Sequence, residues 1–452
     1  MALPPGPGLL PMLQTYQWMR RPTQFLDECQ ARYGDTFTIR FAGLQQAIVI
    51  LADPTAIRDV FAAGHEAMHA GEANVFLGPF LGKNSLLLLD DDEHVRQRKL
   101  LLPPFHGERM QAYGREMIAQ TDAVIERWDV GSVFPIHPEF RSITMQIILR
   151  TVFGMEEGER SSRLSSLLTD ALDIVEDPSL LMPFMQVDLG RFNAWGRYQI
   201  LARRVDEILM QVLDERRRDT KTGQHTDILS MLLAARDEQG APMTDEELRD
   251  ELVTLLVAGH ETTATALAWT FRWLLECRGI LDRIVDDIHA ADAAGSPERI
   301  AKLDLLDRTV RESLRLQPII PLVGRLLRRP MLIGGHDLPA GTMVAPAIHL
   351  VHRRPNLYPN PRVFDPDRFL RYKPSPTEWL PFGGGNRRCI GMAFALYEMK
   401  MVVATVLART TMKLAPGAGV AIKRRAITLT PPDGLPVIVT EKRPALPGAR
   451  AA

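Results

Sequence analysis

The sequence is poor in cysteine, and its N-terminal region lacks a long apolar run. Cysteine occurs only as Cys29, Cys277 and Cys389. An odd and sparse set provides no disulfide framework, which indicates a reducing compartment. Residues 1–22 contain neither the ~20 apolar residues that span a bilayer nor a secretory signal pattern. We therefore expect a cytoplasmic protein without a membrane anchor.

A charge excess of either sign is also missing. The formal net charge is −1 over 452 residues, which argues against general nucleic-acid binding. By length alone the chain could hold about three average domains, but no linker, low-complexity tract or repeat divides it. We expect one domain over residues 21–441, with a proline-rich lead-in over 1–20 and a tail without fixed structure over 442–452.

What is present is mostly helical periodicity with a few short strands, which predicts a mainly α fold with a small β region. Thr244 and Glu247 form a capping box that opens a long helix ending near Glu276. Further elements are expected as follows: helices over 108–128, 191–218, 227–236 and 392–407, a hairpin of 35–40 with 45–51, strands over 325–333 and 342–345 around a turn at 334–337, an extended coil over 355–381, and a final strand pair of 427–430 with 435–440.

The most informative motif surrounds Cys389, in the stretch Phe382-Gly383-Gly384-Gly385-Asn386-Arg387-Arg388-Cys389-Ile390-Gly391. The glycines allow a tight turn that side chains would block. A helical pattern follows from Met392, so the thiol lies near a helix N-terminus, whose positive end and free N–H groups favour a thiolate. This environment suits a metal-bound sulfur. A buried structural cysteine is the alternative, which the complete pattern makes a poor explanation.

The spacing Phe-Gly-x-Gly-x-Arg-x-Cys-x-Gly resembles the haem loop of the cytochrome P450 family. The resemblance, which extends over about residues 20–440, implies the P450 prism fold and haem b (iron protoporphyrin IX), with Cys389 as the proximal iron ligand. It also implies a monomeric monooxygenase that uses O2 and takes electrons from NAD(P)H through a ferredoxin and ferredoxin reductase. Phe382, Gly383 and Gly391 are expected to contact haem.

A second motif lies inside the long helix, at Ala258-Gly259-His260-Glu261-Thr262-Thr263. The Thr262 hydroxyl can bond the Ala258 carbonyl four residues earlier, loosen the local ladder and leave a groove beside a carboxylate. This resembles the acid–alcohol pair of cytochromes P450, which implies that Glu261 and Thr262 relay protons to bound dioxygen and that Ala258 touches haem. The alternative is a helix irregularity with two solvated polar residues.

His260 begins no zinc motif, because the position four residues later is Ala264 rather than a second histidine. It points away from the face shared by Ala258 and Thr262. We interpret His260 as a packing residue.

A third motif is Glu312-Ser313-Leu314-Arg315, where the acid and the base are three residues apart on a helix with apolar flanks. Such a pair is usually an exposed ion pair, whereas a buried pair needs further hydrogen-bond partners. Arg368, in a later Phe-Asp-Pro-Asp-Arg-Phe stretch, is a candidate partner. The resemblance implies that Glu312, Arg315 and Arg368 lock the coil behind the haem loop, as a structural device.

Two haem propionates need cations, and arginine suits carboxylates because it pairs with them bidentately. Arg387 is the first candidate, and His94 with Arg98, four residues apart, matches the family's His-x-x-x-Arg. Arg325 is the next candidate. For His94 and Arg98 a charged surface helix is an equal alternative. We interpret Arg96, Lys99 and Arg388 as solvated residues that could face an acidic electron donor.

The resemblance maps substrate contacts to aliphatic and aromatic positions without Arg or Lys, which favours a lipophilic substrate of terpenoid, steroid or fatty-acyl type. We expect its hydroxylation at an unactivated carbon. Residues 182–185 are a candidate lid. The expected substrate contacts are Val75 and Phe76 of the apolar segment 73–87, Thr254, Val257 and Ala258 of the long helix, Ile319, Ile320 and Leu322 after the Glu312 helix, and Ile427 at the last hairpin.

Two other functional classes remain open at this point. A peroxygenase or haem isomerase would need no electron donor, but such proteins tend to lose the acid–alcohol pair, which is present here as Glu261 and Thr262. A haem carrier or gas sensor would not need the groove residues, and a sensor would normally carry an output domain. The sequence therefore favours the monooxygenase.

Overall fold

Helices form most of the computed structural model, which describes residues 3–44, 46–105, 109–175, 177, 180, 185–219, 226–419 and 421–446. The α-helices are α1 (Pro11–Arg20), α2 (Pro22–Tyr33), α3 (Pro54–Ala62), α4 (Gly78–Leu81), α5 (Asp91–Leu101), α6 (Arg109–Ile125), α7 (Ile136–Thr151), α8 (Glu159–Val175), α9 (Ala194–Arg218), α10 (Ile228–Ala234), α11 (Asp245–Glu276), α12 (Arg278–Ala290), α13 (Pro297–Ile300), α14 (Asp304–Leu316), α15 (Ile348–Val351), α16 (Arg368–Arg371) and α17 (Met392–Arg409). Of the candidate lid over 182–185, only Met185 belongs to these described residues.

The strands are short and form separate small sheets. They are β1 (Thr36–Ile39), β2 (Ile48–Leu51), β3 (Met68–His69), β4 (Val133–Pro135), β5 (Arg325–Leu327), β6 (Met331–Ile333), β7 (His336–Leu338), β8 (Met343–Pro346), β9 (Thr410–Leu414), β10 (Lys423–Arg425), β11 (Thr428–Thr430) and β12 (Pro436–Lys442). The prediction of a mainly α protein with a small β region is confirmed.

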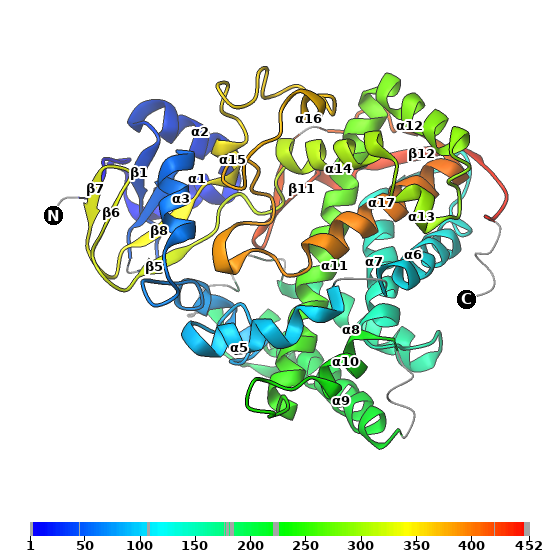
Figure 1. Cartoon of the computed structure of the whole chain (residues 1–452), viewed down its shortest axis with the longest axis horizontal. Helices are drawn as coiled ribbons and strands as arrows, with labels where there is room; N and C mark the ends of the chain where they lie inside the picture. The colour runs from blue at the N-terminus through cyan, green and yellow to red at the C-terminus, as the bar shows by residue number, and fades with distance from the viewer. Residues whose placement is uncertain are drawn as a thin grey trace.

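The long helix α11 runs through the middle of the molecule, and α7, α14 and α17 pack against it (Figure 1). It begins where the sequence predicts, because Thr244 Oγ1 accepts the Glu247 N–H at 3.2 Å while the Glu247 carboxylate accepts the Thr244 N–H at 2.7 Å. Most of its 32 residues are buried. A helix buried on several sides is the frame on which the surrounding elements are placed.

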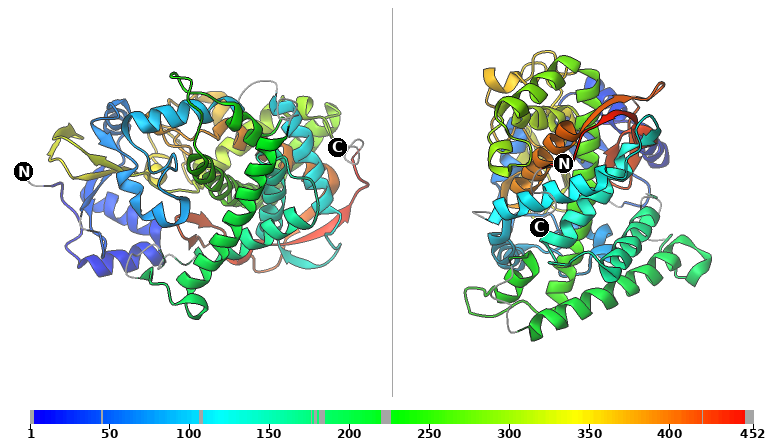
Figure 2. Two further views of the ribbon diagram at one scale, coloured as in Figure 1. Left: turned by 90° about the horizontal axis from the view of Figure 1, so that it is seen from below. Right: turned by 90° about the vertical axis from the view of Figure 1, so that its right-hand side faces the viewer.

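The largest sheet lies at one side of the molecule, in the order β1-β2-β8-β5-β3 (Figure 1). β1 and β2 form the predicted antiparallel hairpin, and β2 also pairs with β8 in parallel. All four side chains of β2 are buried, because apolar clusters that include residues of α2 and α3 cover the sheet. α9 packs along α8 and forms the lower edge of the molecule in the right-hand view of Figure 2.

Three strand predictions are wrong in detail. The expected strand 325–333 is divided into β5, which pairs with β3 and β8, and β6, which pairs with β7 in its own hairpin. His336 and Asp337, predicted in the turn, belong to β7. The expected final pair does not exist either, because β11 pairs with β10 whereas β12 pairs with β4 and β9. A short strand forms where tertiary structure brings a partner strand near it, and the local sequence pattern does not specify that partner.

Both chain ends show more contacts than the sequence predicts. α1 lies inside the proline-rich lead-in and is tied to the sheet region, since Gln14 Oε1 accepts the Arg40 N–H at 2.9 Å. Lys442 belongs to β12, and the Arg443 N–H donates to the Arg409 carbonyl at 2.7 Å, so ordered structure continues past residue 441. Among the described residues, none of the helices combines the length and apolar character that a membrane crossing requires.

The predicted coil over 355–381 contains only one short α-helix, α16, and is held by a buried charge network. Glu312 has no solvent exposure and binds Arg315 at 2.7 and 2.9 Å and Arg368 at 2.9 Å. The Asp365 N–H donates to the same carboxylate at 3.0 Å. Both guanidinium groups donate to coil carbonyls, among them those of Pro359, Pro361 and Val363. The arginines thus supply the donors that an irregular backbone needs.

The network extends to the loop that carries Cys389. Arg315 Nη1 donates to the His352 carbonyl at 2.7 Å, and His352 Nδ1 lies 3.0 Å from the Arg315 carbonyl. His352 Nε2 accepts the N–H of Leu380 at 2.8 Å. Burial holds the pKa of His352 well below its ordinary value, so the ring is neutral with its proton on Nδ1. The coil is thereby fixed two residues before Phe382.

We predict that Glu312→Gln lowers the free energy of unfolding by about 3–5 kcal/mol, because it leaves two buried arginines without a carboxylate. Urea unfolding followed by circular dichroism measures the change. Glu215→Gln is the matched control, since Glu215 forms a 2.7 Å pair with Arg160 at the exposed surface and should cost only ~0–1 kcal/mol. Equal losses in the two variants would contradict the structural importance of the Glu312 network.

Candidate active site

The glycines of the Cys389 loop are required by the packing of α3. Phe61 lies so close that a Cβ on Gly384 would be 2.4 Å from its ring, and a Cβ on Gly385 would be 2.6 Å from its carbonyl oxygen. Gly383 and Gly385 have φ angles of +65° and +66°, a region that side chains disfavour. The resulting turn lets the Cys389 N–H donate to the Phe382 carbonyl at 2.9 Å.

The Cys389 thiol meets opposing influences. Burial raises its pKa, whereas the N–H of Gly391, which is the N-cap of α17, and the charges of Arg98 and Arg388 act in the opposite direction. Desolvation is the largest of these effects. The residue remains accessible, as a metal ligand must be. A cation bound to the sulfur would oppose the effect of desolvation and favour the thiolate.

Four cationic or potentially cationic side chains converge near this loop. His94 and Arg98 come from α5, Arg325 from β5 and Arg387 from the Cys389 loop. Burial and the neighbouring Arg387, Arg98 and Arg325 lower the pKa of His94 to about 3. Burial and nearby arginines also lower the pKa of Arg325 and of Arg387 to about 10. The expectation of a solvated surface helix around His94 is excluded, because its side chain is buried.

This excess of positive charge fits a dianionic ligand. None of the described residues forms a hydrogen bond with the buried Nδ1 of His94, and a buried polar atom without a partner is costly. Two propionates would supply hydrogen-bond acceptors and the missing negative charge. The described residues therefore fit haem: Cys389 for the iron, and His94, Arg98, Arg325 and Arg387 for the propionates.

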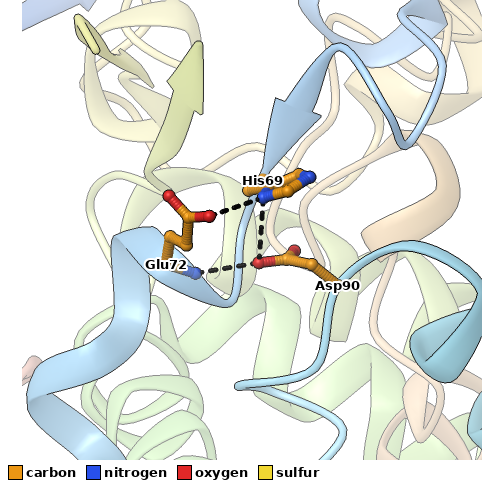
Figure 3. A group of neighbouring side chains, drawn as sticks. All are labelled: His69, Glu72 and Asp90. Carbon is orange, nitrogen blue, oxygen red and sulfur yellow. Dashed lines mark hydrogen bonds and ion pairs between the residues drawn. The ribbon is translucent and has the colours of Figure 1, made fainter. Parts of the chain in front are cut away.

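Asp90 holds Arg387 and was not recognised from the sequence. Its carboxylate pairs with Arg387 and accepts the N–H groups of Ala70, Gly71 and Glu72 at 2.9–3.0 Å. His69 Nδ1 lies 2.8 Å from Glu72 and 3.7 Å from Asp90 (Figure 3). These interactions join the Cys389 loop to the residues just before the apolar segment 73–87, which we call the roof segment. In the sequence, Asp90 is only the first of four consecutive acids at the start of α5.

The groove motif of α11 has the predicted threonine contact in an unbroken helix. Thr262 Oγ1 donates to the Ala258 carbonyl at 2.6 Å, and Ala258 is exposed in the middle of an otherwise buried helix. The helix continues without interruption, so the expected loosening of the ladder is wrong. Gly259 serves a different purpose, since a Cβ there would be 3.1 Å from Ile148 of α7. His260 is buried and lies 2.8 Å from Thr144.

Glu261 is turned toward α7. Its Oε2 lies 2.9 Å from Arg141 Nε, and its Oε1 lies 3.6 Å from His137 Nε2 and 3.4 Å from Thr265 Oγ1. Sequence reasoning missed Arg141 and His137, because nothing in the helical pattern of α7 marks them as neighbours of Glu261. The acid is thus held in place by partners from another helix.

The interpretation of the basic residues of α5 as solvated is wrong for Arg96. Arg96 forms ion pairs of 2.7 Å with both Asp237 and Glu247, which join α5 to the start of α11. Lys99 is more exposed and pairs with Glu238 at 2.6 Å. Arg388 is exposed next to the Cys389 loop. Of these three residues, only Arg388 keeps a position suited to an external partner, because it is exposed and pairs with no acid in the part of the chain that the structure describes.

The expected substrate residues come from four segments that hydrogen bonds tie together. The Leu429 N–H donates to the Ile319 carbonyl at 2.9 Å, and Trp269 Nε1 donates to the Leu429 carbonyl at 2.8 Å. This places the β10–β11 hairpin, with Ile427 at its turn, against α11 and the segment after α14. Phe76, Val257, Ala258, Ile320, Leu322 and Ile427 are partly or fully accessible.

Three of the expected substrate residues have less suitable positions. Ile319 is buried, and the Thr254 hydroxyl is occupied by Ser85 and the Asp250 carbonyl, both at 2.7 Å. Val75 is 70% exposed. The roof segment itself is anchored through Phe80, whose ring lies 5.6 Å from that of Trp195 and 5.2 Å from that of Tyr198 on α9. The roof segment therefore packs against α9 through these aromatic rings.

Comparison with known proteins agrees with this geometry. Residues 4–437 match the family model "Cytochrome P450", and the chain belongs to the cytochrome P450 family. Cytochrome P450 135B1 of Mycobacterium tuberculosis is 40% identical over 443 residues, covering 98% of this chain and 92% of that protein. Cytochrome P450 135A1 of the same species is 37% identical over 434 residues, covering 96% and 94%.

Solved structures give the same result for the fold. A cyanobacterial cytochrome P450, CYP120A1, solved with retinoic acid bound, superimposes with a TM-score of 0.84 at 26% identity, covering 97% of this chain and 99% of that one. The protein is therefore a haem-thiolate monooxygenase with the P450 fold, acting on a lipophilic substrate with O2 and electrons from a redox partner.

Proposed function

We propose that the chain hydroxylates a terpenoid, steroid or fatty-acyl compound, in which Cys389 would ligate the haem iron and electrons would come from NAD(P)H through a ferredoxin system. The observation that carries the proposal is the gathering of four basic residues around the Cys389 loop. The accessible Ala258 beside the Thr262 hydroxyl on α11 supports it. Bound haem supplies the activation of O2, which a thiolate ligand favours by donating electron density.

The residues of the chain bind, orient and move protons in this proposal. His94, Arg98, Arg325 and Arg387 hold the propionates, and Phe382, Gly383 and Gly391 shape the loop beneath the cofactor. The Thr262 hydroxyl donates its one proton to the Ala258 carbonyl, so it must release that carbonyl before it can donate a hydrogen bond into the groove. Glu261 carries protons to that hydroxyl from the α7 side.

The substrate proposal rests on the aliphatic character of the residues facing the groove. Two arginines next to Ile427 are engaged elsewhere: Arg424 stacks 5.2 Å from the ring of Trp18, and Arg425 lies 3.5 Å from His137. Neither arginine is therefore placed to anchor a substrate carboxylate at this hairpin. The isoprenoid ligand of the cyanobacterial neighbour also favours an extended lipophilic substrate, although that ligand carries a carboxylate.

The electron-donor proposal rests on the surface behind Cys389. A hollow of about 330 Å³ lies beside the loop. Its lining includes the aromatic residues Phe61, Trp379 and Phe382 and the exposed arginines Arg58 and Arg388. A basic rim around an apolar hollow suits an acidic ferredoxin. The free cysteines agree with a reducing compartment, and we propose a cytoplasmic monomer.

We expect Cys389→Ala to abolish the thiolate-type absorption band of the reduced carbon monoxide complex, because the iron loses its sulfur ligand. Difference spectroscopy after haem reconstitution measures the band. Cys277→Ala is the matched control, since Cys277 lies at the C-terminal end of α11. A normal band in Cys389→Ala would refute the assignment.

Thr262→Ala should divert reducing equivalents to hydrogen peroxide while haem and substrate still bind, because the groove loses its hydroxyl. The quantities to measure are product and peroxide formed per NAD(P)H consumed. Thr270→Ala is a control on the same helix, where the hydroxyl also bonds a carbonyl four residues earlier, at 2.8 Å. An unchanged product yield in Thr262→Ala would show that the hydroxyl has no part in proton delivery.

Affinity should increase with the apolar area of the ligand, by ~25 cal/mol per Å² buried, and neutral ligands should bind more tightly than carboxylates of equal size. Titrations that follow the shift of the haem Soret band test this with matched terpenoid, steroid and fatty-acyl pairs. Consistently tighter binding of small polar or charged ligands would overturn the lipophilic proposal.

A further inference from the structure

One imidazole and three carboxylates meet at the place where the roof segment begins and ends. His69 belongs to β3, and Glu72 opens the short helix η1 (Glu72–Leu77), which leads into the roof segment. Asp90 and Asp91 follow the far end of that segment, at the start of α5. The four side chains are therefore brought together although the whole roof segment separates them in the chain. The haem and substrate contacts described above leave His69 and Glu72 without a task.

The ring of His69 has carboxylate oxygens at both of its nitrogens. Nδ1 lies 2.8 Å from Glu72 Oε1 and 3.7 Å from Asp90 Oδ2 (Figure 3), and Nε2 lies 3.1 Å from Asp91 Oδ2. A neutral imidazole has a single N–H, and an ionised carboxylate can only accept. One ring nitrogen of a neutral His69 would thus point its lone pair at negative oxygens. A cation is needed there, either a second proton or a metal ion.

The Nδ1 side has the ligand types and the spacing of a zinc site. Zn²⁺ binds imidazole nitrogen and carboxylate oxygen at ~2.1 Å in a tetrahedral arrangement, which places neighbouring ligand atoms ~3.4 Å apart. The distances from Nδ1 to Glu72 and Asp90, 2.8 and 3.7 Å, lie on either side of that value. The ligand atoms of His69, Glu72 and Asp90 all lie within 4.8 Å of one another. Small side-chain adjustments are therefore enough to seat an ion.

Asp90 divides its partners between its two oxygens. Oδ1 pairs with Arg387 and accepts the N–H groups of Ala70 and Gly71. Oδ2 accepts the Glu72 N–H at 2.9 Å and is the oxygen that faces the imidazole. Because a carboxylate oxygen has more than one acceptor position, Oδ2 can bind an ion while Oδ1 keeps its present contacts.

Asp91 provides the supporting contact that metal-binding histidines usually have. A metal-bound imidazole generally donates its other N–H to a carboxylate or a carbonyl, which fixes the orientation of the ring. Asp91 is placed to accept the Nε2–H of His69 in this way, at 3.1 Å. Asp91 also has a φ of +48°, a left-handed conformation that is uncommon outside glycine. The backbone thus adopts an unusual conformation at the residue whose carboxylate reaches the ring.

Charge and access both suit a cation. Arg328 pairs with Glu72 at 3.2 Å and Arg387 pairs with Asp90, so two arginines stand against the three carboxylates around the ring. A propionate bound to Arg387 would increase the excess of negative charge. The Glu72 side chain is 39% exposed, whereas that of His69 is 9% exposed. An ion can therefore enter from solvent beside Glu72 and reach a nitrogen that is held in place.

We propose that His69 Nδ1, Glu72 and Asp90 bind one divalent transition-metal ion of the zinc type, with Asp91 supporting the histidine. The ion joins the residues just before the roof segment to those just after it. A bond between the two ends of a loop removes conformational freedom from the chain between them, so the roof segment becomes less mobile when the ion is bound. The site is thus a cation-dependent staple of the roof segment.

Zinc binding to the haem-loaded protein tests the site. After a chelator has been applied and removed, calorimetric titration with ZnCl2 should show a saturable site that is lost in His69→Gln and in Glu72→Gln. Asp91→Asn keeps a residue that tolerates the left-handed conformation and should weaken binding ~10-fold, as the loss of a supporting carboxylate does. Mg²⁺ prefers oxygen ligands in octahedral geometry and should bind more weakly. Asp90 is kept in all variants, because its loss would also release Arg387.

Two further variants separate the site from general effects of mutation. Arg328→Gln removes a cation beside Glu72, so the affinity for Zn²⁺ should rise roughly threefold, a gain that misfolding cannot produce. His65→Gln is the matched control, since His65 lies 3.7 Å from Asp92 and both side chains are exposed. It should leave the affinity unchanged.

Hydrogen–deuterium exchange of the backbone measures the effect on the roof segment. Zn²⁺ should slow exchange over residues 73–87 in the unchanged protein and should have no effect there in His69→Gln. The strand β9 at the other side of the molecule is the internal control and should exchange at the same rate with and without Zn²⁺.

Each outcome decides one part of the proposal. The absence of saturable Zn²⁺ binding, or binding that persists unchanged in His69→Gln, overturns the site and leaves a proton as the cation on the ring. Saturable binding without slower exchange over residues 73–87 overturns the role as a staple. A site lost in His69→Gln and Glu72→Gln, weakened in Asp91→Asn, strengthened in Arg328→Gln and unchanged in His65→Gln supports the assignment.

Discussion

The buried carboxylate of Glu312 is the interaction on which the site depends. An ion with no solvent exposure is stable only when its charge and its acceptor positions are satisfied, and here Arg315, Arg368 and a backbone N–H do so. The remaining donors of the two arginines bind carbonyls of the coil over 355–381. An irregular segment is thereby given one conformation, and through His352 and Leu380 that conformation is passed on to the Cys389 loop.

The cofactor side of the site shows the opposite situation, in which charge is left unbalanced. His94, Arg98, Arg325 and Arg387 meet with Asp90 as the acid that binds Arg387. A protein interior tolerates such an excess where a dianionic ligand completes it. The same acid, Asp90, gathers backbone N–H groups of the segment before the roof, so cofactor binding and the position of the roof are coupled through one carboxylate.

The α7–α11 contact joins packing to proton chemistry. Gly259 permits the close approach of Ile148, and this closeness brings Arg141 and His137 within reach of Glu261. Arg141 also pairs with Asp173 of α8, so one arginine connects three helices. α11 therefore carries the acid Glu261, and residues of α7 fix the orientation of its side chain.

The sequence by itself determined the helical character, the capping box at Thr244, the first hairpin and the glycine loop before Cys389, because each depends on residues near one another in the chain. The order of the motifs also determined the family. Tertiary structure decided the strand partners of β5, β11 and β12, the pairing of Arg96 with Asp237, and the contacts of Asp90 and Arg141. Those contacts join residues far apart in sequence, and a single charged side chain carries no local signal of the partner that folding brings to it.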